Sequence, residues 1–299
     1  MQLGYIGLGK MGKNMVLLLR EKNYDVIAYN RTPKSDQELP KKRVKTVGST
    51  KELVRNLKPP RLLWLMVSHQ GVDAVLKELV PRLKPGDTII DGGNSPFKES
   101  IRRAKNLANK KINFLDVGVS GGPKGARDGA CMMIGGKKPV FKKYEKLFKD
   151  LTVKGGYGYM GQAGAGHFVK MVHNGIEYGM MQAIAEGFDI MRHNKIFDLD
   201  LVQVADVYNH GSVITSRLIG WLKNGLEKYG IEMKKISGSA SHTGEGAWTV
   251  QYAKKIKIPV RIIEGSFKVR QESQKKPSYQ GKIISTLRNQ FGQHEVNKK

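Results

Sequence analysis

A glycine-rich turn near the N-terminus constrains the fold more than any other feature of the sequence. The motif Gly7-Leu8-Gly9-Lys10-Met11-Gly12 lies between a β-type run over residues 2–6 and a helical pattern over residues 11–21. In such a strand-turn-helix setting the first glycine permits a tight bend, the second lets a pyrophosphate approach the backbone, and the third lets helix and strand pack closely. The predicted dinucleotide cradle, with the phosphates at the helix N-terminus, consists of Gly7, Leu8, Gly9, Lys10, Met11 and Gly12.

The end of the second predicted strand, residues 25–29, indicates which dinucleotide binds. The next three residues are Asn30, Arg31 and Thr32, at the place where an NAD enzyme carries Asp or Glu for the adenosine ribose. Arg31 offers charge-assisted hydrogen bonds to a 2′-phosphate, and Asn30 and Thr32 offer neutral ones. We therefore predict NADP as the preferred cofactor and keep NAD as the alternative, in which Arg31 is only a loop cation. The predicted cofactor site also includes Met66, Val67 and Asn94.

The two halves of the chain carry different patterns. The first half alternates β-type runs with helical segments, which predicts a parallel sheet with helices on both faces. The second half carries helix-compatible patterns without strand signals, and a glycine cluster over residues 155–166 suits a turn or hinge and close backbone packing at the junction. We therefore predict an α/β fold with a Rossmann-type doubly wound parallel sheet (residues 1–162), followed by an all-α substrate and oligomerisation domain (residues 163–299). Predicted strands span residues 2–6, 25–29, 62–67, 88–91 and 113–117, and helical patterns span 167–193, 200–226 and 248–257.

The charge of the chain raises a rival hypothesis. Lys and Arg number 52 against 26 Asp and Glu, a net charge of +26, which suits a nucleic-acid-binding protein. The basic pairs recur along the whole sequence without forming one block with interleaved aromatics, and this spread argues against a nucleic-acid partner. We expect solvated surfaces whose field attracts anionic substrates.

Other segments bear on the compartment. The longest apolar run, residues 62–67, is far shorter than the roughly 20 residues of a transmembrane helix, and the N-terminus leaves no room for a signal peptide before its strand. We expect a cytoplasmic protein without a membrane partner. Cys131 is the single cysteine, so it cannot form an intramolecular disulfide or a metal cluster, and we expect it to be a small buried hydrophobe.

The segment from Gly164 to Tyr178 is the most informative of the second half. Helical spacing places Lys170, Asn174 and Glu177 on one face, at i, i+4 and i+7, with His173 and Tyr178 on its flanks. In isolation this pattern also suits a solvated face on which His173 and Glu177 pair.

Combined with other segments, the pattern resembles a known family. Asp91-Gly92-Gly93-Asn94-Ser95, Val119-Ser120-Gly121-Gly122, the helix from His167 to Tyr178 and the ending Arg288 to His294 together resemble the short form of decarboxylating 6-phosphogluconate dehydrogenase, over nearly the whole chain. The cradle, the Ser-Gly-Gly and the Lys-x-x-x-Asn are shared with the wider β-hydroxyacid dehydrogenases, such as 3-hydroxyisobutyrate dehydrogenase. The Asp-Gly-Gly-Asn-Ser, Asn-Gly-Ile-Glu-Tyr and Phe-Gly-x-His motifs are more specific.

The resemblance implies a reaction and its catalytic residues. Lys170 would accept the proton of the carbon-3 hydroxyl during hydride transfer, and burial would lower its pKa so that it is neutral. Protonated Lys170 would then polarise the keto oxygen during decarboxylation, with no metal, and Glu177 would protonate the enediol to give ribulose 5-phosphate. The alternatives are a β-hydroxyacid dehydrogenase without decarboxylation, or an enzyme for another sugar acid.

The same resemblance implies the substrate contacts. The sugar acid would be held by Asn94, Ser120, Gly121, Gly122, His173 and Asn174. The phosphate and its chain would be held by Tyr178, Thr249, Arg270 and, from a partner subunit, Arg288 and His294, which implies a homodimer or homotetramer with a crossing C-terminal tail. Two residues depart from the family pattern: Ala247 stands where Lys or Arg is usual, and Thr215 replaces an arginine. Both put the affinity for a phosphorylated substrate in question.

Overall fold

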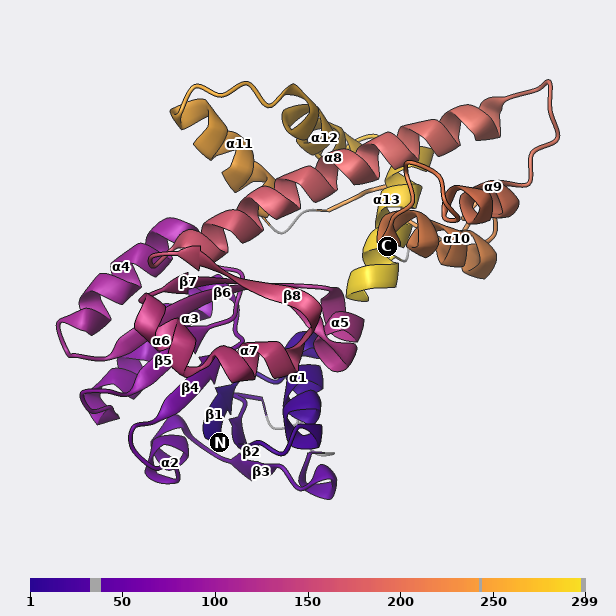
Figure 1. Cartoon of the computed structure of the whole chain (residues 1–299). Coiled ribbons are helices and arrows are strands. Elements are labelled where there is room, and N and C mark those ends of the chain that lie inside the picture. Colours follow the sequence, from indigo (N-terminus) through magenta and orange to yellow (C-terminus); the bar gives the residue numbers. More distant parts are fainter. Residues whose placement is uncertain (33–38, 242–243, 297–299) are drawn as a thin grey trace. The chain divides into compact units, whose positions relative to one another are not determined.

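The computed structural model describes residues 1–32, 39–241 and 244–296 and divides into two compact units, Met1–Lys170 and Met171–Lys299 (Figure 1). No helix within the described ranges is long and apolar enough to cross a membrane.

An eight-stranded sheet forms the centre of the first unit, in the order β3-β2-β1-β4-β5-β6-β7-β8. All neighbouring strands are parallel except β6 and β7, which are antiparallel. The predicted Rossmann-type sheet is confirmed, and its last part is mixed where we expected only parallel strands. The strands are β1 (Gln2–Ile6), β2 (Asp25–Tyr29), β3 (Lys45–Val47), β4 (Leu62–Leu65), β5 (Thr88–Asp91), β6 (Asn113–Ser120), β7 (Ala130–Gly136) and β8 (Thr152–Gly161).

Helices cover both faces of this sheet (Figure 1). Because successive strand residues point to opposite faces, Tyr5 joins one core with α1, α5, α6 and α7, whereas Ile6 joins a second core with α2, α3 and α4. Doubly wound packing follows from this alternation. The helices are α1 (Lys10–Glu21), α2 (Thr50–Arg55), α3 (His69–Leu79), α4 (Phe97–Ala108), α5 (Gly122–Asp128), α6 (Lys138–Lys143) and α7 (Glu145–Leu151), with short 3₁₀ turns η2 (Pro40–Lys42) and η3 (Val80–Arg82).

At the end of the sheet, one expectation was wrong and another was met in part. Cys131 is exposed, because β7 turns this residue outward while its neighbours Ala130 and Met132 are buried. Much of the glycine cluster, expected as a turn or hinge with close backbone packing, belongs to the edge strand β8, which pairs with β7 and packs Tyr159 near the Phe141 ring. The close packing is present at Gly166, where an added Cβ would collide with the carbonyl oxygens of Asp116 and Met133.

The second unit is all helical, as predicted. Its core is built from apolar residues of several helices, including Phe188, Leu222 and Ile284. The pattern expected as one helical stretch over residues 200–226 is two helices, because Gly211 has φ +78° and Ser216 caps a new helix by accepting from the amide of Ile219. The helices are α8 (Ala165–His193, which begins in the first unit), α9 (Leu201–Tyr208), α10 (Arg217–Tyr229), α11 (Glu245–Lys255), α12 (Arg261–Ser273) and α13 (Tyr279–Gly292).

Candidate active site

The glycines of the predicted cradle have three separate geometric roles. Gly7 has φ +100°, and a side chain there would collide with the Met66 carbonyl. A side chain at Gly12 would collide with the Gly7 carbonyl, so this glycine allows α1 to lie close to the turn. At Gly9 an added Cβ has nothing within 4 Å. Within the described residues, no side chain caps the N-terminus of α1. Open space at Gly9 and uncapped amides fit a bound pyrophosphate.

Asn30 bonds to the backbone of the cradle and of β2's end, and its predicted contact with the cofactor stays a prediction. Its Oδ1 accepts a hydrogen bond from the Leu8 amide at 3.0 Å, and its Nδ2 donates to the Thr32 carbonyl at 2.8 Å. Asn30 therefore ties the glycine turn to the end of β2, while Arg31 and Thr32 are exposed. Residues 33–38, which follow, lie outside the described ranges.

The Asp91–Ser95 segment is held in place by the buried carboxylate of Asp91. Asp91 accepts from the Gly93 amide at 3.1 Å and from the Ser95 hydroxyl at 2.9 Å. Arg103 of α4, also buried, lies 3.4 Å from Asp91 and donates to Ser95 at 3.0 Å. Asn94 projects from this fixed segment at the carboxyl end of β5, half-buried, where ligands bind in open α/β sheets.

Ser120, Gly121 and Gly122 lie where β6 ends and α5 begins. Gly121 and Gly122 have φ +122° and +63°, conformations that favour glycine. The Gly121 carbonyl accepts from Gly125 as α5 begins. These three residues and Asn94 occupy the carboxyl ends of neighbouring strands, as predicted.

The first turn of α8 is bonded to a carboxylate of the sheet. Asp116 of β6 is fully buried and accepts from the amides of Gly164 at 2.7 Å and His167 at 2.9 Å. A negative charge at a helix N-terminus satisfies open amides and stabilises the helix dipole. Lys170 follows one turn later, is buried, and lies against Gly118, where any added side chain would collide with Lys170. The sequence thus fixes the start of α8, and with it Lys170.

Beyond Lys170, α8 carries the other predicted polar residues within the second unit. The Nδ1 of His173 lies 3.0 Å from Asn174 Oδ1 and 3.8 Å from Glu177 Oε2. The i,i+4 pair that a solvated face would contain is therefore present, and the side chains of His173 and Glu177 remain 35% and 24% exposed. This partial exposure leaves Glu177 accessible to a ligand.

A cationic cluster surrounds Tyr178 on the neighbouring helices. Arg270 of α12 is 2% exposed, and its guanidinium carbon lies 3.4 Å from the centre of the Tyr178 ring. Burial lowers the pKa of Arg270 to about 10, and the charge of Arg288 adds to this effect, whereas Tyr178 and the carboxylates of Glu177 and Glu245 oppose it. Arg270 therefore stays protonated at neutral pH.

Arg288 belongs to the same cluster of the same chain. It is buried, donates to the Ser241 hydroxyl at 2.6 Å, and burial lowers its pKa while Tyr178 and Glu245 raise it. α13 packs within its own unit and places Arg288 beside Arg270 and Tyr178 of the same chain. The partner-subunit contribution of Arg288 stays a prediction. His294 lies 6.4 Å from the Phe291 ring centre, and Ser237 donates to the Val296 carbonyl, so the described tail also packs on its own unit.

α11 packs on α8 through small residues. Thr249 donates to the Met171 carbonyl at 2.8 Å, and a side chain at Gly246 would meet the Tyr178 ring. Ala247 follows in the first turn of α11, and Thr215 donates to the Tyr208 carbonyl at 3.2 Å. Thr249 thus contacts backbone, and its predicted role at the substrate stays a prediction.

The sequence does not single out three residues that support the site in the first unit, Arg103, Asp116 and His167. It also does not single out Glu245 of the second unit, whose charge raises the pKa of Arg270 and Arg288. Each is a buried ionisable side chain, but none stands in a pattern that separates it from a surface charge. Arg103, in a helix whose neighbours 102 and 105 are basic, looks like another solvated cation.

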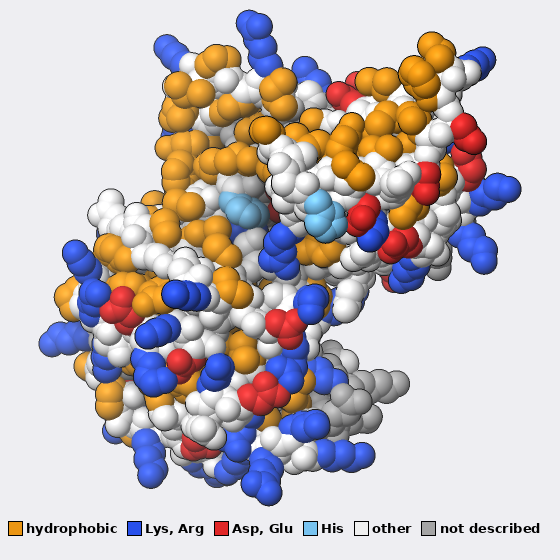
Figure 2. All heavy atoms as spheres, turned by 45° about the vertical axis from the view of Figure 1, so that its right-hand side comes forward, with side chains coloured by type: hydrophobic (Ala, Val, Ile, Leu, Met, Phe, Trp, Pro, Cys, Tyr) orange, Lys and Arg blue, Asp and Glu red, His pale blue; other side chains and the backbone are white. Residues whose placement is uncertain are grey.

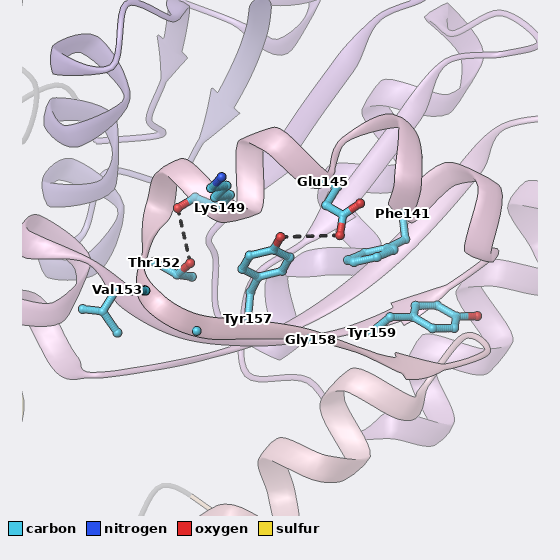
Figure 3. A pocket seen from close by; sticks show the side chains of 10 residues that line it. Phe141, Glu145, Lys149, Thr152, Val153, Tyr157, Gly158 and Tyr159 are labelled. Atoms are coloured by element: carbon cyan, nitrogen blue, oxygen red, sulfur yellow. Dashed lines mark hydrogen bonds between the residues drawn. The ribbon is translucent and has the colours of Figure 1, made fainter.

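A surface pocket of about 570 Å³ lies at α6, α7 and β8 and includes Phe141, Tyr157 and Tyr159 (Figure 3). It shares no residue with the predicted site. Lys and Arg side chains are scattered over the face drawn in Figure 2, in agreement with the spread of basic pairs in the sequence.

Family models match both halves of the chain. Residues 2–161 match the NAD binding domain of 6-phosphogluconate dehydrogenase, and residues 166–299 match the 6-phosphogluconate dehydrogenase C-terminal domain.

Individual relatives agree with these matches. The chain is 44% identical over 299 residues to YqeC of Bacillus subtilis, covering 100% of both. It is 36% identical to the NAD(+)-dependent decarboxylating 6-phosphogluconate dehydrogenase of Haloferax volcanii, covering 100% of the chain and 99% of that protein. The Candida albicans decarboxylating enzyme is 40% identical over 87% of the chain, which spans only 53% of that relative.

Solved structures give the same fold. The Plasmodium falciparum 6-phosphogluconate dehydrogenase, studied with NADP+ and with 6-phosphogluconate, has a TM-score of 0.83 at 32% identity, over 92% of this chain and 62% of that one. A Salmonella typhimurium 3-hydroxyisobutyrate dehydrogenase has a TM-score of 0.77 at 17% identity, over 95% and 98% of the two chains, a likeness of fold alone.

Proposed function

We propose that this chain, which belongs to the 6-phosphogluconate dehydrogenase family, catalyses the NADP-dependent oxidative decarboxylation of 6-phosphogluconate to ribulose 5-phosphate and CO2. The observation that carries the proposal is that one helix, α8, bears a buried lysine fixed at its start and a partly exposed glutamate seven residues later. On this proposal the enzyme serves the pentose phosphate pathway and gluconate utilisation in the cytoplasm.

Lys170 is the proposed base. In its neutral form it accepts the proton of the carbon-3 hydroxyl as carbon 3 gives up its hydride. Gly7, Gly9 and Gly12 would hold the dinucleotide, which would supply the hydride acceptor. The resulting 3-keto acid loses its carboxyl group as CO2, and the electron pair of the broken bond moves toward the keto oxygen. The ammonium of Lys170 stabilises the charge on that oxygen. Its burial supports both roles, because a dry site strengthens the interaction and favours the neutral amine beforehand.

Glu177 is the proposed acid. The enediol left by decarboxylation must receive a proton at the carbon that becomes carbon 1 of ribulose 5-phosphate. Glu177 is accessible to a ligand, and His173 lies 3.8 Å from its carboxylate and can exchange protons with it. Asn94, Ser120, Gly121, Gly122 and Asn174 are the proposed contacts to the sugar acid.

The substrate phosphate is proposed to bind at Arg270 and Arg288. The positive charges of these two buried side chains repel each other, and this repulsion lowers the pKa of Arg270. A phosphate dianion bound beside them would offset the repulsion and accept charge-assisted hydrogen bonds from both. Such a cluster in one chain offers a replacement for the cation missing at Ala247. Tyr178 and Thr249 are the proposed neutral contacts.

NADP is the proposed cofactor, with NAD as the alternative. Arg31 and Thr32 are exposed beside the cradle and can meet a 2′-phosphate, whereas Asn30 shapes the turn through Leu8. The 36% identical Haloferax protein is named NAD(+)-dependent, so the preference needs measurement on this chain.

We also propose that the protein is a homodimer or homotetramer associating through its helical unit. Most of its large exposed apolar side chains belong to this unit, and hydrophobic side chains gather there in Figure 2. Such surface is the kind that oligomers bury. In that assembly His294 would approach a partner's substrate. The exposed residues include Ile176, Met180, Ile190, Val207 and Ile262.

The deciding experiment supplies the purified protein with 6-phosphogluconate labelled at the carboxyl carbon and follows CO2 release and cofactor reduction together. Equal amounts of CO2 and NADPH support the proposal. Cofactor reduction without labelled CO2 would instead identify a non-decarboxylating β-hydroxyacid dehydrogenase. Repeating the assay with gluconate, and with NAD for NADP, separates phosphate recognition from cofactor preference.

A further inference from the structure

His167, a residue without a role in the reaction above, is 2% exposed in the first turn of α8 and is engaged on both ring nitrogens. Nδ1 lies 2.7 Å from the hydroxyl of Ser100 in α4, and Nε2 lies 3.1 Å from the Gly93 carbonyl. A carbonyl can only accept, so Nε2 carries the proton and Nδ1 accepts from Ser100. The ring is thus held as one tautomer between two other segments of the unit.

The contact to Gly93 completes the fixation of that residue. Its amide already donates to Asp91 at 3.1 Å, and its carbonyl accepts from His167. With both backbone groups bonded, the next residue, Asn94, has little freedom to move. A side chain at Gly93 would also meet the Val67 carbonyl at 2.6 Å, so the segment is confined on that side as well.

The same histidine is fixed to the sheet through its backbone. Its amide donates to Asp116 at 2.9 Å, and Lys170 lies three residues along the same helix, almost one turn away. His167 therefore joins two parts of the proposed site that come from distant parts of the sequence: the segment that carries Asn94 and the helical turn that carries Lys170.

We propose that His167 is a positioning residue: its Nε2–H bond to the Gly93 carbonyl sets the placement of Asn94 relative to Lys170. This inference rests on the proposed function, because the distance it controls matters when the carbon-3 hydroxyl must lie between base and cofactor. Misplacement by about 1 Å can cost about 100-fold in rate.

Two conservative variants separate the effects of the two hydrogen bonds that the imidazole ring makes. His167→Gln can place an amide nitrogen near the position of Nε2 and keep the bond to Gly93. His167→Asn can place its oxygen near Nδ1, keeping the Ser100 bond and losing Gly93. Tyr159→Phe is the matched control, because it removes a 2.8 Å side-chain bond to another glycine carbonyl, that of Gly136, in the same unit.

The experiment measures kcat, KM, the NADP dissociation constant and the isotope effect with 3-deuterated 6-phosphogluconate. For His167→Asn we expect kcat to fall about 100-fold, a larger isotope effect and an NADP dissociation constant within twofold. His167→Gln should recover at least a tenth of wild-type kcat, and Tyr159→Phe should match wild type. Equal losses in both His167 variants, following their melting temperatures, would overturn the inference, as would a wild-type kcat in His167→Asn.

Amide hydrogen exchange provides a second test, which needs no substrate. In His167→Asn we expect residues 92–96 and 164–171 to lose protection together, whereas His167→Gln should keep it; unchanged protection in His167→Asn would contradict the link. If wild-type protein does not turn over 6-phosphogluconate, the proposed function fails, and the exchange result still decides whether His167 joins the two segments.

Discussion

The cradle of the first unit and the arginine cluster of the second are both suited to phosphate, but they are built from different groups. At the cradle, Gly9 leaves open space beside the start of α1, where no side chain of the described residues caps the helix. Around Tyr178, long cationic side chains from α12 and α13 are buried and held by an aromatic ring and a hydroxyl. Backbone amides cost little to keep in place, whereas each buried guanidinium has lost its hydration.

This difference predicts different consequences of mutation. A change at the cradle acts through shape, since any side chain at Gly7 or Gly12 meets backbone. A change in the cluster acts through charge and specificity, and removing a buried cation need not lower stability. α8 belongs to both units, because it carries Lys170 in the first and Tyr178 in the second.

The largest effect is expected at Lys170. Lys170→Met keeps an aliphatic stem against Gly118 and removes the amine, so we expect kcat to fall by about 10⁴-fold, the upper range for a proton-transfer group. The measurement is steady-state NADPH formation, with NADP binding and thermal unfolding as controls. Lys170→Ala should behave alike in rate. Activity within tenfold of wild type in Lys170→Met would refute the role as base.

A variant of Arg270 tests whether the arginine cluster binds the substrate phosphate through its charge. Arg270→Met fills similar volume beside Tyr178 and removes the cation, so kcat/KM for 6-phosphogluconate should fall by roughly 10²- to 10³-fold, the loss of charged hydrogen bonds. Activity on gluconate and the melting temperature should change little. Lys268→Met removes an exposed cation from the same helix and is the matched control. An equal loss on both substrates would place the phosphate elsewhere.

Glu177 tests whether acid catalysis is separate from binding. In Glu177→Gln the size of the side chain is kept and the proton donor is lost, so we expect kcat to fall by about 100-fold. Dissociation constants for both ligands, measured by fluorescence quenching or calorimetry, should stay within threefold. A variant with normal turnover would show that another group supplies the proton.

Variants of Asn30 test whether its side chain only stabilises the glycine turn or also influences the choice between NADP and NAD. Asn30→Asp retains an oxygen that can accept from Leu8 but adds a negative charge beside the position proposed for the 2′-phosphate. We expect the ratio of kcat/KM for NADP to that for NAD to fall by about tenfold, through charge repulsion of about 1.4 kcal/mol. Asn30→Ala should lower both values together, since it loosens the turn. An unchanged ratio in Asn30→Asp would separate this position from cofactor choice.

The same contrast explains what could be predicted from sequence. The cradle is six consecutive residues, and its geometry is local, so Gly7, Gly9 and Gly12 were placed correctly from the motif alone. The helix that carries Lys170 and Glu177 was likewise predicted correctly, because helical spacing is regular, whereas their catalytic roles, which the resemblance implies, stay predictions. Strands β7 and β8 were missed, because β8 contains glycines that locally favour turns and gains its stability from pairing with a neighbour. Sequence periodicity carries no information on that partner.

The arginine cluster needed the family resemblance, since its members come from α8, α11, α12 and α13. In a chain with 52 basic residues, Arg270 and Arg288 do not differ locally from solvated cations. Asp116 and His167 were missed for the same reason: their partners are about 50 to 75 positions away in the sequence. The contribution of a partner's Arg288, which only the resemblance implies, stays a prediction.

Ala247 provides the smallest and most specific test of the cluster. If Arg270 and Arg288 already neutralise the phosphate, restoring the family's cation with Ala247→Lys adds one partly exposed charge, worth up to about 1 kcal/mol. We then expect KM for 6-phosphogluconate to fall by no more than about fivefold, with no change for gluconate. Glu245 lies in the same first turn of α11 and would partly offset the new charge. A fall of 100-fold would mean that the two buried arginines leave the phosphate largely uncompensated, and that Ala247 marks a chain adapted to a different sugar acid.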